Sequence, residues 1–151
     1  MPLYNPPTAA SNFVDWTSFT PTGSWSTNTS YSGMYKRVGD TLFCRVVILL
    51  TGAPTSASLT VNLPSGLSID TTKIVNPTAA FPNLGSGAAL DAATAVYPLT
   101  VHYSTASAVA VYAANASGTY TSIVGASQAV PFTFGNGDAV ELNYIVPISG
   151  W

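Results

Sequence analysis

Carboxylates and one histidine are the side chains of this chain that could perform acid–base chemistry. The 151 residues hold only six carboxylate side chains, at Asp15, Asp40, Asp70, Asp91, Asp138 and Glu141. Asp138 and Glu141 lie closest, but an odd separation along a strand places two side chains on opposite faces. A glycosidase-type pair would need two carboxylates from distant parts of the chain to meet. We expect no enzyme activity and no catalytic residues, and a small glycan-cleaving protein is the enzyme-class alternative.

The single histidine and the single cysteine are also poor candidates for catalysis. His102 lies in PLTVHYS, where a period of two places it on the face of Thr100 and opposite Val101. This pattern predicts a half-exposed strand residue. Cys44 lies in the apolar run LFCRVVILL and is expected to be a small buried hydrophobe. One cysteine excludes an internal disulfide and a cysteine-based zinc site.

Cofactor, nucleic-acid and membrane sites are not expected either. The sequence has no phosphate loop, dinucleotide fingerprint, calcium loop or metal-ligand spacing, so we predict no cofactor and no metal. The net charge is −2 and Lys36-Arg37 is the only adjacent cationic pair, which argues against nucleic-acid binding. The longest apolar run, residues 46–50, is too short to span a bilayer. The first residues lack the pattern of a signal peptide, so synthesis in a cytoplasm is expected.

Aromatic side chains in Ser-, Thr- and Gly-rich stretches could instead bind sugars. The candidate glycan contacts are Trp25, Tyr31 and Tyr120, because such rings offer flat apolar faces with polar tips. The competing interpretation, which we favour, is that these rings fill the ends of the fold or contacts between subunits.

The elements that would position these side chains are strands. Helical periodicity is nearly absent, and β-branched and aromatic runs are broken by Gly, Pro, Asn and Ser. Residues 31–38 and 41–50 are predicted to pair as a hairpin around Gly39-Asp40. Further strands are predicted at residues 59–63, 99–103 and 109–113, within LGSGAALDAATA, and after the turn at 135–138. Some seven to nine short strands indicate an all-β, antiparallel β-sandwich of jelly-roll type.

The chain is predicted to divide into a short arm and one domain. Residues 1–11 contain Pro2, Pro6 and Pro7, which forbid a helix and disfavour a central strand, so an extended N-terminal arm is expected. Residues 12–151 would form the jelly-roll domain, a length that can bury a sizeable core.

Low charge and two-sided apolar patterning indicate packing against other chains. Charged residues make up 7% of the sequence, against about 25% in average soluble domains. The run from Val46 to Leu50 is apolar on both faces, so both faces must be covered. A sandwich core covers one of them, and another subunit or another element of the chain must cover the other. The last strand ends on Trp151, although chain ends are usually polar and frayed.

Three stretches resemble the small β-jelly-roll proteins of tailed-bacteriophage virions. They are FTPTGSWS, YKRVGDTLFCRVVI with TGAPTSASLTVNLPSGL, and PFTFGNGDAVELNYIVPISGW. Proteins of this kind serve as capsid decoration (cement) proteins or as heads of tail fibres. The resemblance is weakest between Lys73 and Val130. It implies a homotrimer of jelly rolls, similar in architecture to tumour-necrosis-factor-like heads, without catalytic residues.

The implied trimer assigns roles to the two-sided strand and to the last strand. If the last strand runs at the centre of a trimer, neighbouring subunits bury its apolar side chains, each large aromatic contributing roughly 2–3 kcal/mol. The predicted subunit-interface residues are Val47, Leu49, Tyr144, Val146, Ile148 and Trp151.

Among the roles that the resemblance allows, we expect capsid decoration. The sequence starts at Met1 and has room for a short arm and one domain, whereas fibre heads usually follow a long shaft. The expected partners are copies of the chain and the major capsid protein, on the exterior of the virion capsid. The predicted capsid-contact residues are Leu3, Tyr4, Pro6 and Pro7. The alternative is a trimeric receptor-binding head of a tail fibre that recognises glycans on the host surface.

Overall fold

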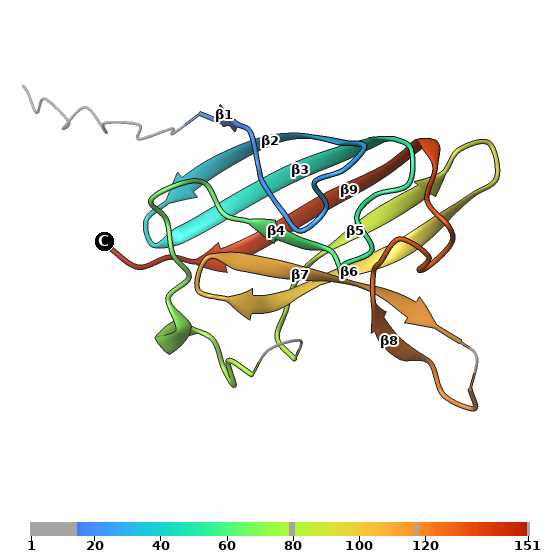
Figure 1. Ribbon diagram of the computed structural model, residues 1–151. Helices are drawn as coiled ribbons and strands as arrows, with labels where there is room; N and C mark the ends of the chain where they lie inside the picture. The colour runs from blue at the N-terminus through green and yellow to red at the C-terminus, as the bar shows by residue number, and fades with distance from the viewer. Residues whose placement is uncertain (1–14, 79–80, 117, 151) are drawn as a thin grey trace, which may run out of the picture.

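The structure is a computed structural model that describes residues 15–78, 81–116 and 118–150, and it is all-β (Figure 1). The described residues form nine strands and one short 3-10 helix, η1. Their bounds are β1 (Thr17–Phe19), β2 (Thr29–Val38), β3 (Thr41–Thr51), β4 (Thr60–Asn62), η1 (Thr71–Lys73), β5 (Asn83–Asp91), β6 (Ala95–Thr105), β7 (Ala108–Asn115), β8 (Ser122–Gly125) and β9 (Asn136–Pro147). The prediction of an antiparallel all-β domain is confirmed.

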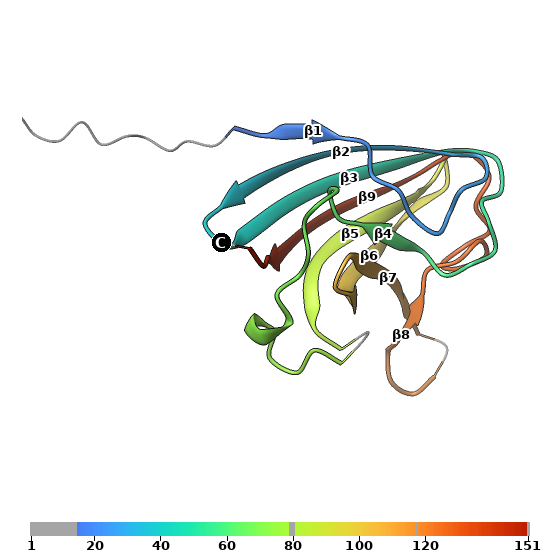
Figure 2. The same ribbon diagram turned by 60° about the vertical axis from the view of Figure 1, so that its left-hand side comes forward.

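The strands form one continuous antiparallel sheet. They hydrogen-bond in the order β1-β2-β3-β9-β5-β6-β7-β4, and β8 pairs with β7. Strands twist, and bulges increase the twist, so a long sheet curls on itself. The register shifts between Leu49 and Thr51, between Asn83 and Gly85, and between Tyr103 and Thr105. Figure 2 shows the result: β2, β3, β9 and β5 arch over β6, β7 and β4.

The two ends of the curled sheet meet through the segment that follows β1. Gly23 forms an antiparallel bridge with Val61 of β4. The Ser24 amide donates to the Thr60 carbonyl at 3.1 Å, and the Asn62 amide donates to the Thr22 carbonyl at 2.8 Å. A β-carbon at position 23 would strike the Thr60 carbonyl oxygen, so this close approach requires glycine.

The predicted hairpin and its alternation are confirmed. β2 and β3 pair from Thr29↔Leu50 to Val38↔Thr41, and Gly39 in the turn has a φ of +60°. Along β3, burial alternates: Val46 and Ile48 are completely buried in the core, and Leu49 on the opposite face is 52% exposed. β9 alternates in the same way beside it. The inner surface of the arch is therefore the core, and its outer surface faces away from the chain.

An exposed ion cluster fastens η1 to the β2–β3 turn. Lys73 Nζ lies 2.8 Å from Asp40 Oδ2 and 3.4 Å from Asp70 Oδ2. The hydrogen bond and the charge of Lys73 lower the pKa of Asp40. The pKa of Asp70 is lowered first by the hydrogen bond from the Thr72 hydroxyl, with Lys73 adding to it.

Replacing Lys73 with methionine is expected to make the protein less sensitive to acid. A carboxyl group whose pKa is lowered by folding stabilises the fold above its unfolded pKa of about 4, and this contribution is lost as the pH falls further. Without Lys73, folding lowers the pKa values of Asp40 and Asp70 by less, so the variant loses less stability in acid. The difference is small because the groups are exposed. Thermal unfolding midpoints from pH 3 to pH 7 should fall less steeply for the variant. Parallel pH profiles for the two proteins would contradict this.

Candidate assembly surface

The outer face of the arch presents apolar side chains to solvent. We define this outer face as the side chains of β2, β3, β9 and β5 that alternate with the core residues. Leu49 on β3 is 52% exposed, Ile145 on β9 is 49% exposed and Met34 on β2 is 43% exposed. Apolar side chains that gather on one surface mark an interaction site more often than single exposed ones do.

The outer face also carries three charged side chains: Lys36 on β2, Arg45 on β3 and Glu141 on β9. The Arg45 guanidinium lies 4.7 Å from the centre of the Trp16 ring. The Lys36 ammonium lies 5.6 Å from the same ring and 5.8 Å from the ring of Phe43. Both ion pairs among the described residues involve Lys73, so none of these three charges has an ion-pair partner within that part of the chain.

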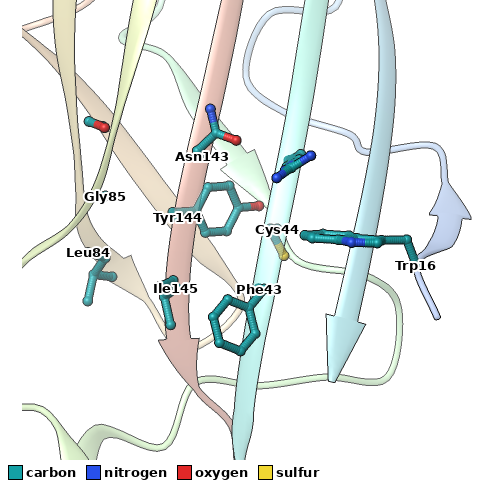
Figure 3. A pocket seen from close by; sticks show the side chains of 10 residues that line it. Trp16, Phe43, Cys44, Leu84, Gly85, Asn143, Tyr144 and Ile145 are labelled. Carbon is teal, nitrogen blue, oxygen red and sulfur yellow. The ribbon is translucent and has the colours of Figure 1, made fainter. Parts of the chain in front are cut away.

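Two shallow grooves run across the outer face. The first has a volume of about 340 Å³, and Figure 3 shows Trp16 reaching across β2 toward β3, while Asn143 and Ile145 line the groove from β9. The second has a volume of about 460 Å³, and its walls include Met34, Arg45 and Glu141. Arg45 lines both grooves. The surface therefore offers aromatic, aliphatic and ionic contacts side by side.

Three of the predicted interface residues are core residues. Tyr144 is 2% exposed, and Val146 and Ile148 are completely buried within the chain itself. The curl of the sheet turns their face inward, so the expectation that neighbouring subunits bury them is corrected. Val47 and Leu49 lie on the outer face, as an interface would require. Trp151 and the predicted capsid contacts lie outside the described residues; the latter are Leu3, Tyr4, Pro6 and Pro7.

The three glycan-contact candidates have different environments. Trp25 is completely buried, its ring packs edge-on against Phe134 at 5.0 Å, and its Nε1 donates to the Ala57 carbonyl at 2.9 Å. Trp25 is therefore a core residue, which corrects its assignment as a sugar platform. The Tyr31 hydroxyl donates to the Trp25 carbonyl at 2.9 Å, and burial raises the pKa of Tyr31 to about 12. Tyr120, between β7 and β8, is 86% exposed.

Three further side chains that could do chemistry, Cys44, His102 and Asp138, are buried. Cys44 is buried as predicted, and burial raises the pKa of its thiol to about 12. His102 is buried, contrary to the expectation of half exposure, and its Nε2 lies 2.9 Å from the hydroxyl of Thr100 on the predicted shared face. Asp138 is buried and accepts from the Gly135 amide at 2.6 Å, whereas Glu141 is exposed, so these carboxylates do lie on opposite faces.

The described residues hold neither a metal-ligand cluster nor a membrane-spanning helix. Across residues 15–78, 81–116 and 118–150, no group of three or more His, Cys, Asp or Glu side chains could hold a metal ion. In the same ranges, no helix is long and apolar enough to cross a membrane.

Reasoning from the sequence did not identify Trp16, Arg45 and Glu141 as parts of one surface. Alternation along β3 and β9 could have placed Arg45 and Glu141 on outward faces. It could not have made the two strands neighbours, because that depends on pairing between distant segments. Comparison of the chain with protein-family models, curated proteins and solved structures finds no match.

Proposed function

We propose that this chain is a structural protein of a tailed-bacteriophage virion that decorates the outside of the capsid. It would act as a homo-oligomer, expected to be a trimer of jelly-roll-type domains. The sequence resemblance supplies the class of protein. The observation that carries the proposal is the outer face, where Met34, Leu49 and Ile145 are exposed on strands whose hydrogen bonds are already formed. A rigid, partly apolar surface of this kind suits packing against protein.

The buried polar groups support a structural role. Cys44, His102 and Asp138 lie inside the fold. His102 contacts Thr100 of its own strand and the ring of Tyr112 on β7, and Asp138 accepts from the Ala92 amide. What the chain offers a partner is therefore its surface. A decoration protein acts mechanically, because each bound copy adds buried area and stabilises the expanded shell by mass action. The contacts to the major capsid protein from residues 1–11 stay a prediction.

Binding to particles tests the proposed function. The purified chain, mixed with particles of the encoding phage that lack it, is expected to bind the capsid in numbers that scale with the capsid subunits. Deleting residues 1–11 should abolish this binding because the predicted arm contacts are removed. Tyr120→Ala should bind as the unchanged protein does, and it serves as the matched control. Bound copies can be counted by quantitative gel densitometry and located by electron microscopy.

A receptor-binding head of a tail fibre is the second candidate, and the exposure of Tyr120 favours it. An aromatic ring that is 86% exposed on a loop can stack on a sugar. In that case only a few copies would bind, at the tail, and Tyr120→Ala would abolish adsorption to the host. That pair of results would overturn the capsid proposal.

A further inference from the structure

We propose that the outer face is covered by the outer face of a second copy of the chain, with Arg45 of one copy paired to Glu141 of the other. This inference rests on the homo-oligomer of the proposed function and specifies how its copies meet. It begins from the register of β3 and β9. Arg45 lies opposite Asn143, and Val47 lies opposite Glu141.

Arg45 and Glu141 are therefore diagonal neighbours on one surface, about 7–8 Å apart by the usual spacing of such positions. Both side chains are exposed, and both line the groove of about 460 Å³. When two copies are related by a half turn about an axis that lies in the interface midway between these positions, position 45 of one copy lies over position 141 of the other. The positive charge of one copy then lies over the negative charge of the other, twice, which makes the patch self-complementary.

Trp16 restricts the position of the Arg45 side chain, which favours such a contact. The guanidinium lies 4.7 Å from the ring centre, over the face of the indole, where the cation and the ring attract each other. A guanidinium has five N–H donors, so those that point away from the ring can bind a carboxylate. Holding the side chain in place lowers the entropy that is lost when a partner binds.

The outer face approaches the size of a protein interface. Neighbouring strands lie about 4.8 Å apart and residues rise about 3.4 Å, so β2, β3, β9 and β5 beside residues 41–49 cover roughly 19 Å by 27 Å. That is about 500 Å² in projection, and protruding side chains add accessible area. A stable interface buries roughly 800 Å² per partner. Leu49 and Ile145 supply the exposed apolar contacts on either side of the charges.

The charge pattern favours a copy of the chain over other occupants. The face carries Lys36, Arg45 and Glu141, which sum to 2 − 1 = +1. A polyanion would be repelled by Glu141, and a basic partner by Arg45. A second copy meets Arg45 and Glu141 with their opposites, and the charge of Lys36 takes no part in this pairing. A half turn relates two copies, so this contact joins copies in pairs and does not by itself build a ring of three.

Charge reversal tests the inference. The mass of the full chain, measured by sedimentation over a range of concentrations, is expected to show an even number of copies, because a half turn relates copies in pairs. Arg45→Glu alone and Glu141→Arg alone should each weaken self-association by about 100-fold or more, because like charges then face each other. The double variant Arg45→Glu/Glu141→Arg should restore it. Arg45→Lys should associate more weakly than the unchanged protein, since an ammonium lacks the flat face and forked edge.

The controls separate this inference from loss of folding and from failure of the proposed function. Asp91→Arg reverses a carboxylate at the end of β5, away from the 45–141 patch, and should leave the oligomer intact. Circular dichroism checks that every variant folds. A monomeric unchanged protein, or a double variant that stays as dissociated as the single ones, would overturn the face-to-face contact. If the charge series behaves as expected and the protein does not bind capsids, the proposed function fails and this contact stands.

Discussion

Trp25→Ala is expected to lower the free energy of unfolding by about 3–5 kcal/mol, the cost of removing a large aromatic side chain from a packed core. Trp25 is completely buried and lies edge-on to Phe134 with 5.0 Å between the ring centres. Alanine leaves a cavity at this contact. It also removes the donor to the Ala57 carbonyl, which Nε1 reaches at 2.9 Å. The loss of stability from the cavity and the loss from the unpaired carbonyl add to each other.

Urea unfolding followed by circular dichroism measures this effect. Trp25→Phe keeps a ring in the cavity and loses only the hydrogen bond and part of the volume, so it should be destabilised much less than Trp25→Ala. Tyr120→Ala is the surface control, and it should unfold within about 0.5 kcal/mol of the unchanged protein because its ring is exposed. Equal midpoints for Trp25→Ala and the unchanged protein would show that Trp25 is not a core residue.

Gly85→Ala is expected to destabilise the protein by about 3 kcal/mol or more, because overpacking against backbone cannot be relieved by a rotamer change. Gly85 lies opposite Tyr144 where β5 pairs with β9. A β-carbon at position 85 would lie 2.6 Å from the Tyr144 Cα and would strike the Asn143 carbonyl oxygen. Both are main-chain atoms of a central strand. The strands would have to separate, and the β5–β9 hydrogen bonds would weaken.

Gly118→Ala is the matched control for this substitution. A β-carbon there would lie 3.7 Å from the Tyr120 carbonyl oxygen, which is ordinary van der Waals contact. Its unfolding midpoint in urea should therefore equal or exceed that of the unchanged protein. Because β5 and β9 together form half of the outer face, Gly85→Ala should also weaken self-association. A stable, fully associated Gly85→Ala protein would contradict the close approach of the two strands.

The features that were predicted from the sequence are those that depend on local patterns. The hairpin around Gly39 was predicted from two alternating runs and a turn residue that tolerates positive φ, and it forms with φ at +60°. The opposite orientations of Asp138 and Glu141 follow from the period of two along a strand. The burial of Cys44 followed from its apolar neighbours. Each of these inferences needs only a few consecutive residues.

The tertiary structure alone determined which face of each strand is covered and which distant strands are neighbours. Alternation shows that Tyr144 and Val146 share a face, but the curl of the sheet decides that their own chain buries it. Trp25 and His102 are buried for the same reason, although Trp25 lies in a Ser- and Thr-rich stretch and His102 shares its face with Thr100. The contact between β3 and β9 joins segments about 100 residues apart and brings Arg45 beside Glu141. Sequence periodicity carries no information about pairing over that separation, because pairing depends on how all nine strands close around one core.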